Sequence, residues 1–144
     1  MSLGQIFDIA GSAMSAQTVR LNTTSSNLAN ADSASSSIDR TYRARHPVFS
    51  AVQQQVMEQG LFGEAAAAQA GVEVAGIVES QAPLQPRYQP EHPMADQDGY
   101  VYYPNVNPIE EMADMISASR SYQVNVEMMN TAKEMIVQTL KLGG

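Results

Sequence analysis

The residues best suited to chemistry gather between positions 91 and 98. Glu91, His92, Asp96 and Asp98 lie together there, and carboxylate and imidazole groups are common ligands of divalent metals. The segment 96–99 (Asp-Gln-Asp-Gly) also resembles the start of a calcium loop, but no bidentate Glu follows at the required spacing. An Asp-Gly turn and a loop flanked by prolines explain the same residues. We therefore predict no metal site and no cofactor.

Catalytic motifs are scarce elsewhere in the chain. There are two histidines, His46 and His92, each followed by proline, and there is no cysteine. No glycine-rich phosphate loop and no Gly-x-Ser-x-Gly elbow is present. We therefore expect no enzyme. A catalyst that uses His92 with Glu91 or Asp96 is the weakest of three hypotheses.

The charge balance argues against nucleic acid as a partner. Eight Lys and Arg against 15 Asp and Glu give a formal net charge of −7. The basic cluster Arg40, Arg43 and Arg45 is too small for a phosphate-binding surface. No run approaches the roughly 20 apolar residues of a membrane span, so we expect no membrane insertion. The first 19 residues hold no Lys or Arg, so we expect no cleaved secretory signal.

The elements that must position these residues begin with two long heptad segments, one near each end of the 144 residues. Apolar residues recur at alternating spacings of three and four, which indicates helices that pack along a seam. The first helix is expected over about 2–30 and the second over about 109–142. Pro108 precedes the second helix and acidic residues follow in its first turns, as the helix dipole favours. The expected seam residues are Leu3, Phe7, Met14, Leu21 and Leu28 in the first helix and Met112, Met115, Tyr122, Val126, Met129, Ile136 and Leu140 in the second.

The middle of the chain has a different pattern. Residues 71–79 alternate as a half-buried strand does, and a second strand is expected around 47–49. The Asp98-Gly99 pair predicts a hairpin turn before a strand at 100–103. A Gln/Ala-rich segment at about 53–70 is expected to be mobile or to face solvent, with a partly helical segment as the alternative. The predicted fold is therefore mainly α with a small β-rich insert: paired terminal helices at 1–31 and 108–144, and a β-rich middle region at 32–107.

The terminal helices are longer than a domain of this size needs. Their apolar seams are small relative to the conformational entropy that is lost when so many residues are fixed. We therefore expect these ends to order when they meet partner subunits.

Several segments are similar to one known family. They are 6–17, 20–22, 26–32, 116–127 and 130–133, joined in the middle by 42–45, 92–96, 99–101 and 104–106. The chain resembles the bacterial flagellar basal-body rod proteins over almost its whole length, and its motifs follow one another in the same order as in that family. The family motif falls on Asn27, Leu28, Ala29, Asn30, Arg120, Ser121 and Tyr122.

The resemblance implies a structural protein of the proximal rod, the drive shaft of the flagellum in the periplasm. It implies export through the flagellar type III apparatus and an inner coiled-coil domain that lines the export channel. The implied partners are other proximal and distal rod proteins, the rod-base and MS-ring junction proteins, the export apparatus and further copies of the chain. By analogy with other early flagellar substrates, Ile6, Phe7 and Ile9 form a candidate export signal. The alternative hypothesis is a soluble flagellar export adaptor or chaperone.

Overall fold

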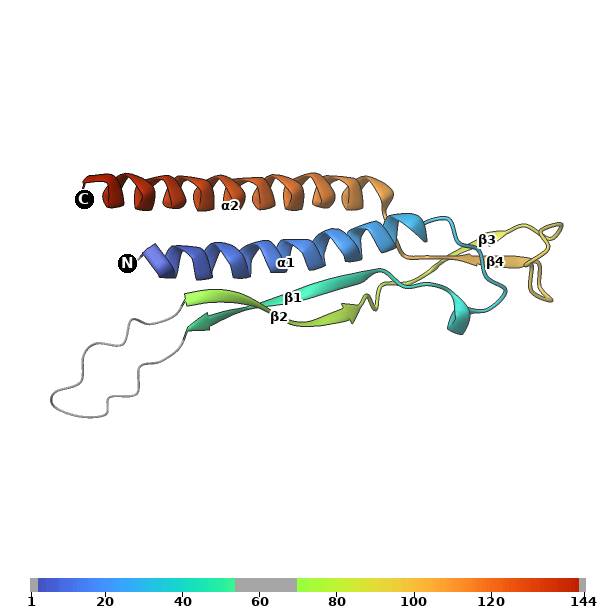
Figure 1. The fold of residues 1–144 in the computed structure, drawn as a ribbon. Helices are drawn as coiled ribbons and strands as arrows, with labels where there is room; N and C mark the ends of the chain where they lie inside the picture. The colour runs from blue at the N-terminus through green and yellow to red at the C-terminus, as the bar shows by residue number, and fades with distance from the viewer. Residues whose placement is uncertain (1–2, 54–69, 143–144) are drawn as a thin grey trace, which may run out of the picture.

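The computed structural model describes residues 3–53 and 70–142 (Figure 1). It confirms a mainly α fold with two small β-hairpins between long terminal helices. The elements, in chain order, are α1 (Leu3–Ala29), the short 3-10 helix η1 (Ile38–Arg40), β1 (Arg45–Gln53), β2 (Ala70–Glu79), β3 (Gln85–Tyr88), β4 (Tyr100–Tyr103) and α2 (Pro108–Leu142).

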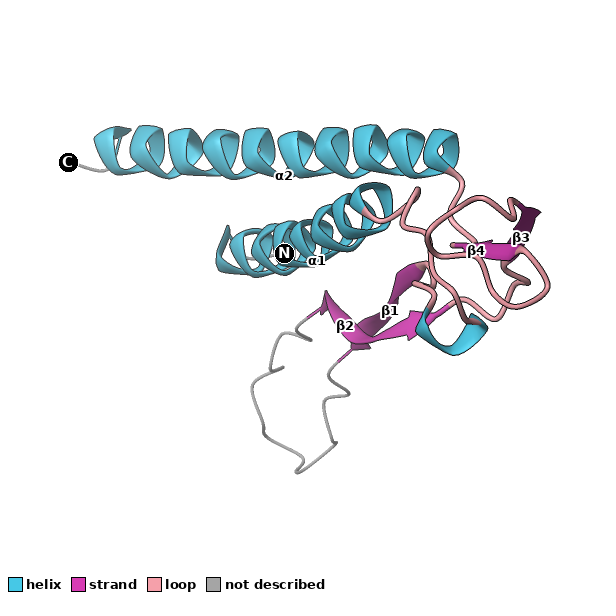
Figure 2. Ribbon diagram, turned by 90° about the vertical axis from the view of Figure 1, so that its right-hand side faces the viewer, coloured by secondary structure: helices cyan, strands magenta, loops and turns pink. Residues whose placement is uncertain are grey.

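The two helices lie side by side and antiparallel, so that the two ends of the chain lie at the same end of the molecule (Figure 1). The β1–β2 hairpin runs along the opposite side of α1, which places α1 between α2 and the hairpin (Figures 1 and 2). The β3–β4 hairpin extends beyond the other end of the helix pair. The central helix is therefore covered on two sides, whereas α2 is covered on one.

The ends of the helices are closed by asparagines. Ahead of α2, the Asn107 side-chain oxygen accepts the Ile109 N–H at 3.1 Å, and the Asn107 carbonyl accepts the Glu111 N–H at 3.0 Å. Glu110 and Glu111 occupy the first turn, as the sequence predicted. After α1, the Asn30 side chain donates to the Ser26 carbonyl at 2.8 Å. These contacts satisfy backbone groups that helix ends leave without partners.

The first hairpin pairs β1 with β2 from Arg45 opposite Glu79 to Gln53 opposite Ala70. Its register shifts between Val48 and Phe49, which marks a β-bulge. The Val72 N–H donates to the Ser12 hydroxyl at 3.2 Å, so β2 lies directly on α1. Both predicted strands are present, but the sequence did not predict that they would lie along α1. The Gln/Ala-rich segment expected at about 53–70 falls almost entirely outside the described residues.

The second hairpin pairs β3 with β4, from Gln85 opposite Tyr103 to Tyr88 opposite Tyr100. The predicted turn is present at Gly99, whose φ of 80° is the left-handed conformation that glycine adopts without strain. This turn ends a longer loop over residues 89–99 instead of forming a two-residue hairpin connection.

The segment between β4 and α2 is held against the rest of the molecule. Pro104 and Val106 are buried. Between them, the Asn105 side chain accepts the Ala44 N–H at 2.8 Å and donates to the Ala82 carbonyl at 2.9 Å. One asparagine thus joins the start of β1, the end of β2 and the start of α2.

Candidate assembly surface and its junction

The face of α2 that packs on α1 is lined with small and polar residues. Glu111, Ala118 and Ala132 are buried there, and half-buried Met115 and Met129 continue the same 4-3 spacing. Ala10 and Ala16 of α1, the helix that lies between α2 and the β1–β2 hairpin, are buried as well. Because the distance between packed helices depends on the side chains at the contact, alanines allow a close approach. The heptad seam therefore exists, but its most buried positions are alanines instead of large apolar residues.

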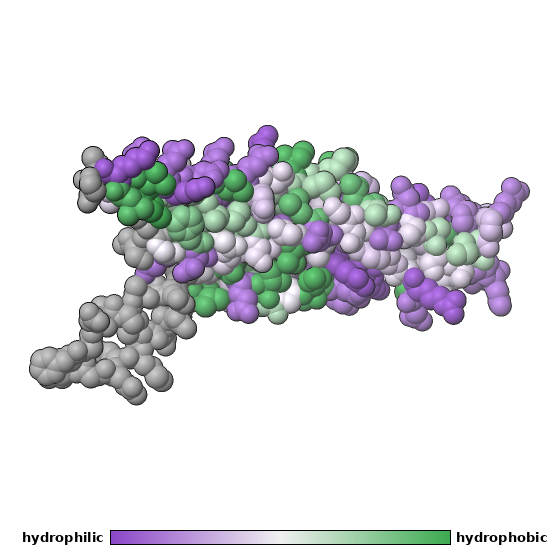
Figure 3. All heavy atoms as spheres, in the orientation of Figure 1, coloured by the Kyte–Doolittle hydropathy of each residue, from purple (hydrophilic) through white to green (hydrophobic). Residues whose placement is uncertain are grey.

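A second apolar row runs along α2 and faces solvent. We call this row the outer stripe. Its members are distributed along the length of α2, with polar residues such as Gln123 and Asn130 between them, and they are more exposed than most apolar side chains, reaching 74% for Ile109 and 71% for Leu140. Figure 3 shows exposed hydrophobic side chains along α2 between hydrophilic ones. The outer stripe consists of Ile109, Met112, Ile116, Val126, Val137 and Leu140.

The predicted packing residues divide between these two surfaces. The structure half-buries one group within the chain: Phe7, Met14, Leu21, Leu28, Met115, Met129 and Ile136. It leaves a second group exposed: Met112, Tyr122, Val126 and Leu140. The side chain of Leu3 lies outside the described set. Contacts of any of these residues between subunits stay predictions.

Near the C-terminal end of α1, the side chain of Asn27 connects three elements of the fold. It is fully buried and uses its whole hydrogen-bonding capacity. Its amide nitrogen donates to the Arg45 carbonyl at 2.8 Å and to a Glu111 carboxylate oxygen at 2.9 Å. Its oxygen accepts the Arg45 N–H and the Tyr42 hydroxyl, each at 2.9 Å. We call Asn27, Tyr42, Arg45 and Glu111 the junction, since they link α1, β1 and α2.

The carboxylate of the junction, that of Glu111, is unusually buried for an acidic side chain. Glu111 is only 5% exposed, and burial raises its pKa above the ordinary value of 4.5. The hydrogen bond from Asn27 opposes this change because it favours the charged form. Burial also raises the pKa of Tyr42, whose hydroxyl binds the same asparagine. The sequence places Asn27 in the family motif but indicates none of its three partners.

An ion pair supports the same end of the helix pair. The Arg20 guanidinium of α1 binds the Asp114 carboxylate of α2 at 2.6 Å, and both side chains are partly exposed. This contact lies about two turns of α1 from Asn27. The polar links between the helices that we describe thus gather where the chain leaves α1 and enters α2.

The remaining motif residues have less specific surroundings. Arg120 is exposed, the Ser121 carbonyl accepts the Asn125 side chain at 2.8 Å, and Leu28 is half-buried. In the candidate export signal, Ile6, Phe7 and Ile9 are all half-buried on α1. Nothing about the packing of these three side chains distinguishes an export signal from an ordinary helix face.

The acidic loop first considered for chemistry is organised as a turn. One Asp96 carboxylate oxygen accepts the N–H groups of Asp98 and Tyr100, at 3.0 and 2.8 Å, and the other accepts the Tyr102 hydroxyl at 3.0 Å. The Tyr100 N–H is the main cause of the lowered pKa of Asp96. The His92 ring accepts the Met94 N–H at 3.1 Å. Within residues 3–53 and 70–142, no three His, Asp or Glu side chains are placed to hold a metal.

The described helices also lack a membrane-spanning candidate: neither has the length and apolarity together that crossing a bilayer requires.

Comparisons with known proteins identify the family. Residues 7–34 match the family described as "Flagella basal body rod protein", and residues 97–142 match "Flagellar basal body rod FlgEFG protein C-terminal". The chain is 49% identical over 145 residues to the flagellar basal-body rod protein FlgC of Salmonella typhimurium, with 99% of each chain covered. The chain belongs to the FlgC family of flagellar basal-body rod proteins.

Other members of the FlgC family extend the same match. The FlgC protein of Borreliella burgdorferi is 34% identical over 155 residues, covering 99% of this chain and 98% of its own. The FlgC protein of Escherichia coli O157:H7 is 49% identical over 143 residues. The chain is accordingly a structural protein of the flagellar rod and not an enzyme.

Proposed function

We propose that this rod protein is a subunit of the proximal rod that assembles by packing its α1–α2 pair against the helix pairs of its neighbours. The observation that carries the proposal is the outer stripe of α2. A monomeric soluble protein rarely exposes so many large apolar side chains along one helix, whereas a subunit buries them on assembly. A surface that binds a different surface on the next subunit builds an open helical shaft.

The proposal gives separate roles to the parts of the chain. The helices at 1–31 and 108–144 would form the inner part of the shaft around the export channel, and the β-rich region at 32–107 would face outward. Torque would then pass between subunits through helix contacts. The candidate partners are other proximal and distal rod proteins, the rod-base and MS-ring junction proteins, and further copies of the chain.

Export through the type III apparatus belongs to the same proposal. The subunit would cross in an unfolded state and reach the rod within the periplasm, and Ile6, Phe7 and Ile9 would guide its entry. A marginally stable monomer suits this route, because the chain must be unfolded before it is exported.

The outer stripe can be tested without disturbing the fold. We expect Ile116→Glu with Leu140→Glu to leave the circular-dichroism spectrum of the monomer unchanged, since both side chains are exposed. The same variant should be lost from isolated basal bodies, and the cells should not swim. Ser117→Glu, an exposed change on another face of the same helix, is the matched control and should assemble normally.

Hydrogen exchange separates a rod subunit from an export adaptor. We expect residues 3–29 and 108–142 to exchange faster in the purified monomer than in the basal body. Absence of the chain from basal bodies, together with full protection of both helices in the monomer, would favour the adaptor or chaperone.

A further inference from the structure

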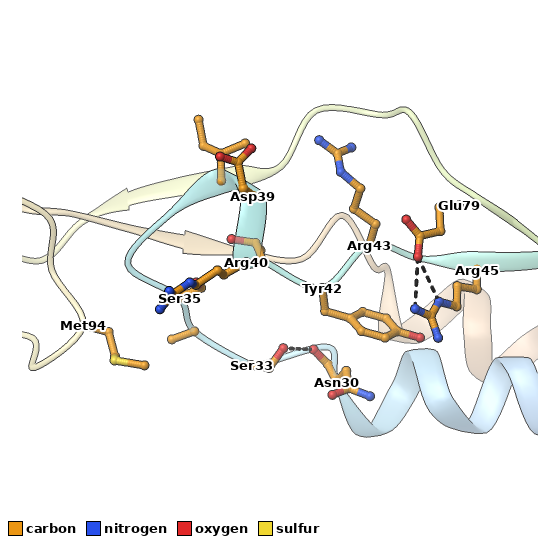
Figure 4. Close-up of a pocket in the computed structure, with 13 residues that line it drawn as sticks. Asn30, Ser33, Ser35, Asp39, Arg40, Tyr42, Arg43, Arg45, Glu79 and Met94 are labelled. Atoms are coloured by element: carbon orange, nitrogen blue, oxygen red, sulfur yellow. Dashed lines mark hydrogen bonds and ion pairs between the residues drawn. The ribbon is translucent and has the colours of Figure 1, made fainter.

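The basic cluster at 40–45 lines a hollow that the proposed helix packing does not use. The hollow has a volume of about 800 Å³ and lies between η1, the start of β1 and the segment after α1 (Figure 4). Three of the eight basic residues of the chain line it, together with Asp39 and Glu79. The hollow is therefore net positive on a chain whose net charge is −7.

Two of the three arginines have no carboxylate partner among the described residues. Arg45 binds Glu79 with two nitrogens, at 3.0 and 3.2 Å. Arg43 donates one nitrogen to the carbonyls of Ser80 and Ala82, at 3.2 and 3.3 Å, which fixes the guanidinium but leaves its charge unneutralised. The Arg40 side chain is exposed and makes no hydrogen bond or ion pair with any described residue. The hollow thus holds two guanidinium groups, of Arg43 and Arg40, that still have N–H donors without an acceptor among the described residues.

The rim of the hollow adds apolar contacts to these charges. Ile38 and Met94 line it and are both exposed, and the Tyr42 ring lies beneath the Arg45 guanidinium, 5.6 Å away. A ligand that satisfies both features carries carboxylates next to an apolar side chain. A guanidinium binds a carboxylate through two parallel hydrogen bonds, which makes arginine well suited to such a ligand.

We propose that the Arg40–Arg43 hollow is a docking site for an acidic segment of a neighbouring rod subunit, with at least two carboxylates beside an apolar residue. The proposal rests on the rod function proposed above. Charge complementarity supports it, because a neighbouring copy of this chain, with its net charge of −7, offers carboxylates to a positive site. A net positive charge this small does not suit a nucleic acid.

The test has a binding arm that does not depend on the rod. The full chain, labelled with nitrogen-15, is titrated with the peptide acetyl-Leu-Glu-Glu-Leu-amide, and the arginine side-chain N–H signals are followed by NMR. We expect the Arg40 and Arg43 signals to shift, and the glutamine counterpart acetyl-Leu-Gln-Gln-Leu-amide to leave them in place. Equal shifts with both peptides, or none with either, would overturn the proposal, as would equal shifts with citrate.

The second arm measures incorporation into the rod. We expect Arg40→Glu to enter basal bodies about tenfold less than the wild type, as the loss of one charge-assisted contact implies. Arg40→Lys keeps the charge and should restore most of the incorporation. Normal incorporation of Arg40→Glu, or its failure to leave the cytoplasm, would refute docking at the hollow. Absence of the wild-type chain from basal bodies would refute the rod function itself.

Discussion

The two ends of the helix pair are held together in different ways. At the junction end, where α1 stops and α2 starts, Asn27 and Glu111 meet inside the protein and Arg20 pairs with Asp114. At the free end, residues 3–16 of α1 lie beside the second half of α2, with buried alanines on both helices and exposed Met135 and Leu140 on α2.

Directional hydrogen bonds fix one geometry, whereas apolar contacts tolerate several. The geometry of the junction end is therefore fixed by contacts within the chain, whereas we expect the free end to take its final packing from a neighbouring subunit.

The sharpest way to break the junction is Asn27→Asp. The new carboxylate still accepts from Tyr42 and Arg45, but it has no N–H to donate and it places a second negative charge beside Glu111. We expect the free energy of unfolding to fall by about 3 kcal/mol in urea titrations.

Two further variants make this result specific. Adding Glu111→Gln to Asn27→Asp should recover part of the loss, because the glutamine amide donates to the new aspartate. Asn130→Asp, an exposed change on α2, is the control and should alter stability little. An Asn27→Asp protein as stable as the wild type would show that the junction does not hold the two helices.

The alanine seam distinguishes the two ends by a change of size. Leucine at Ala118 overfills a fully buried position, and we expect a loss of about 1–3 kcal/mol in the free energy of unfolding. Ala132→Leu should cost less, because the free end can separate without breaking hydrogen bonds. Ala113→Leu places the same side chain on an exposed position and serves as the control. Equal losses at Ala118 and Ala132 would remove the proposed difference between the ends.

The buried carboxylate predicts a pH dependence. The pKa of Glu111 is raised on folding, so its contribution to stability is fully present below the ordinary value of 4.5 and is lost as the pH rises through the folded value. We therefore expect the free energy of unfolding of the wild type, relative to that of Glu111→Gln, to decrease as the pH rises from 4.5 through the folded pKa. Urea titrations at a series of pH values measure this difference. The exposed neighbour Glu110→Gln should show no such trend.

The smallest expected effect is that of the ion pair. Arg20 and Asp114 are partly exposed, so a double-mutant cycle with Arg20→Met and Asp114→Asn should give a coupling energy of about 0.5 kcal/mol. Added salt should reduce it. A coupling that is large and insensitive to salt would mean that this pair belongs with the buried junction.

The helix bounds could be predicted from the sequence because they depend on local signals. The second helix was expected at about 109–142 and is found at Pro108–Leu142. Its start is marked by Asn107 followed by Pro108. The turn at Gly99 and the strand after it are equally local, since an Asp-Gly pair permits the positive φ.

The packed face of α2 was harder to predict. The predicted seam and the observed packed face share Met115 and Met129. The seam also included Met112 and Val126, which are exposed, and it left out Ala118 and Ala132, which are buried. Periodicity weights large apolar residues, whereas close helix packing selects small ones. The large residues are then left for the outer stripe, a distinction that depends on contacts far apart in the sequence.

The junction could not be predicted for a related reason. Asn27 and Glu111 are 84 positions apart, and each has an ordinary explanation near a helix end. Only the packing of α2 on α1 and of β1 beneath it brings them together. The same holds for the hollow, where Arg40 and Glu79 come from separate segments.

The link between β4 and α2 has a mechanical consequence. Pro104 and Pro108 each restrict a backbone φ angle to about −65°, and Asn105 and Val106 are held between them by hydrogen bonds and burial. If α2 rotates, we expect β3 and β4 to turn with it, because the linker between β4 and α2 is not a flexible loop. If the subunits form a shaft as proposed, we expect it to transmit rotation stiffly, with little lag between the helices and the strands of each subunit.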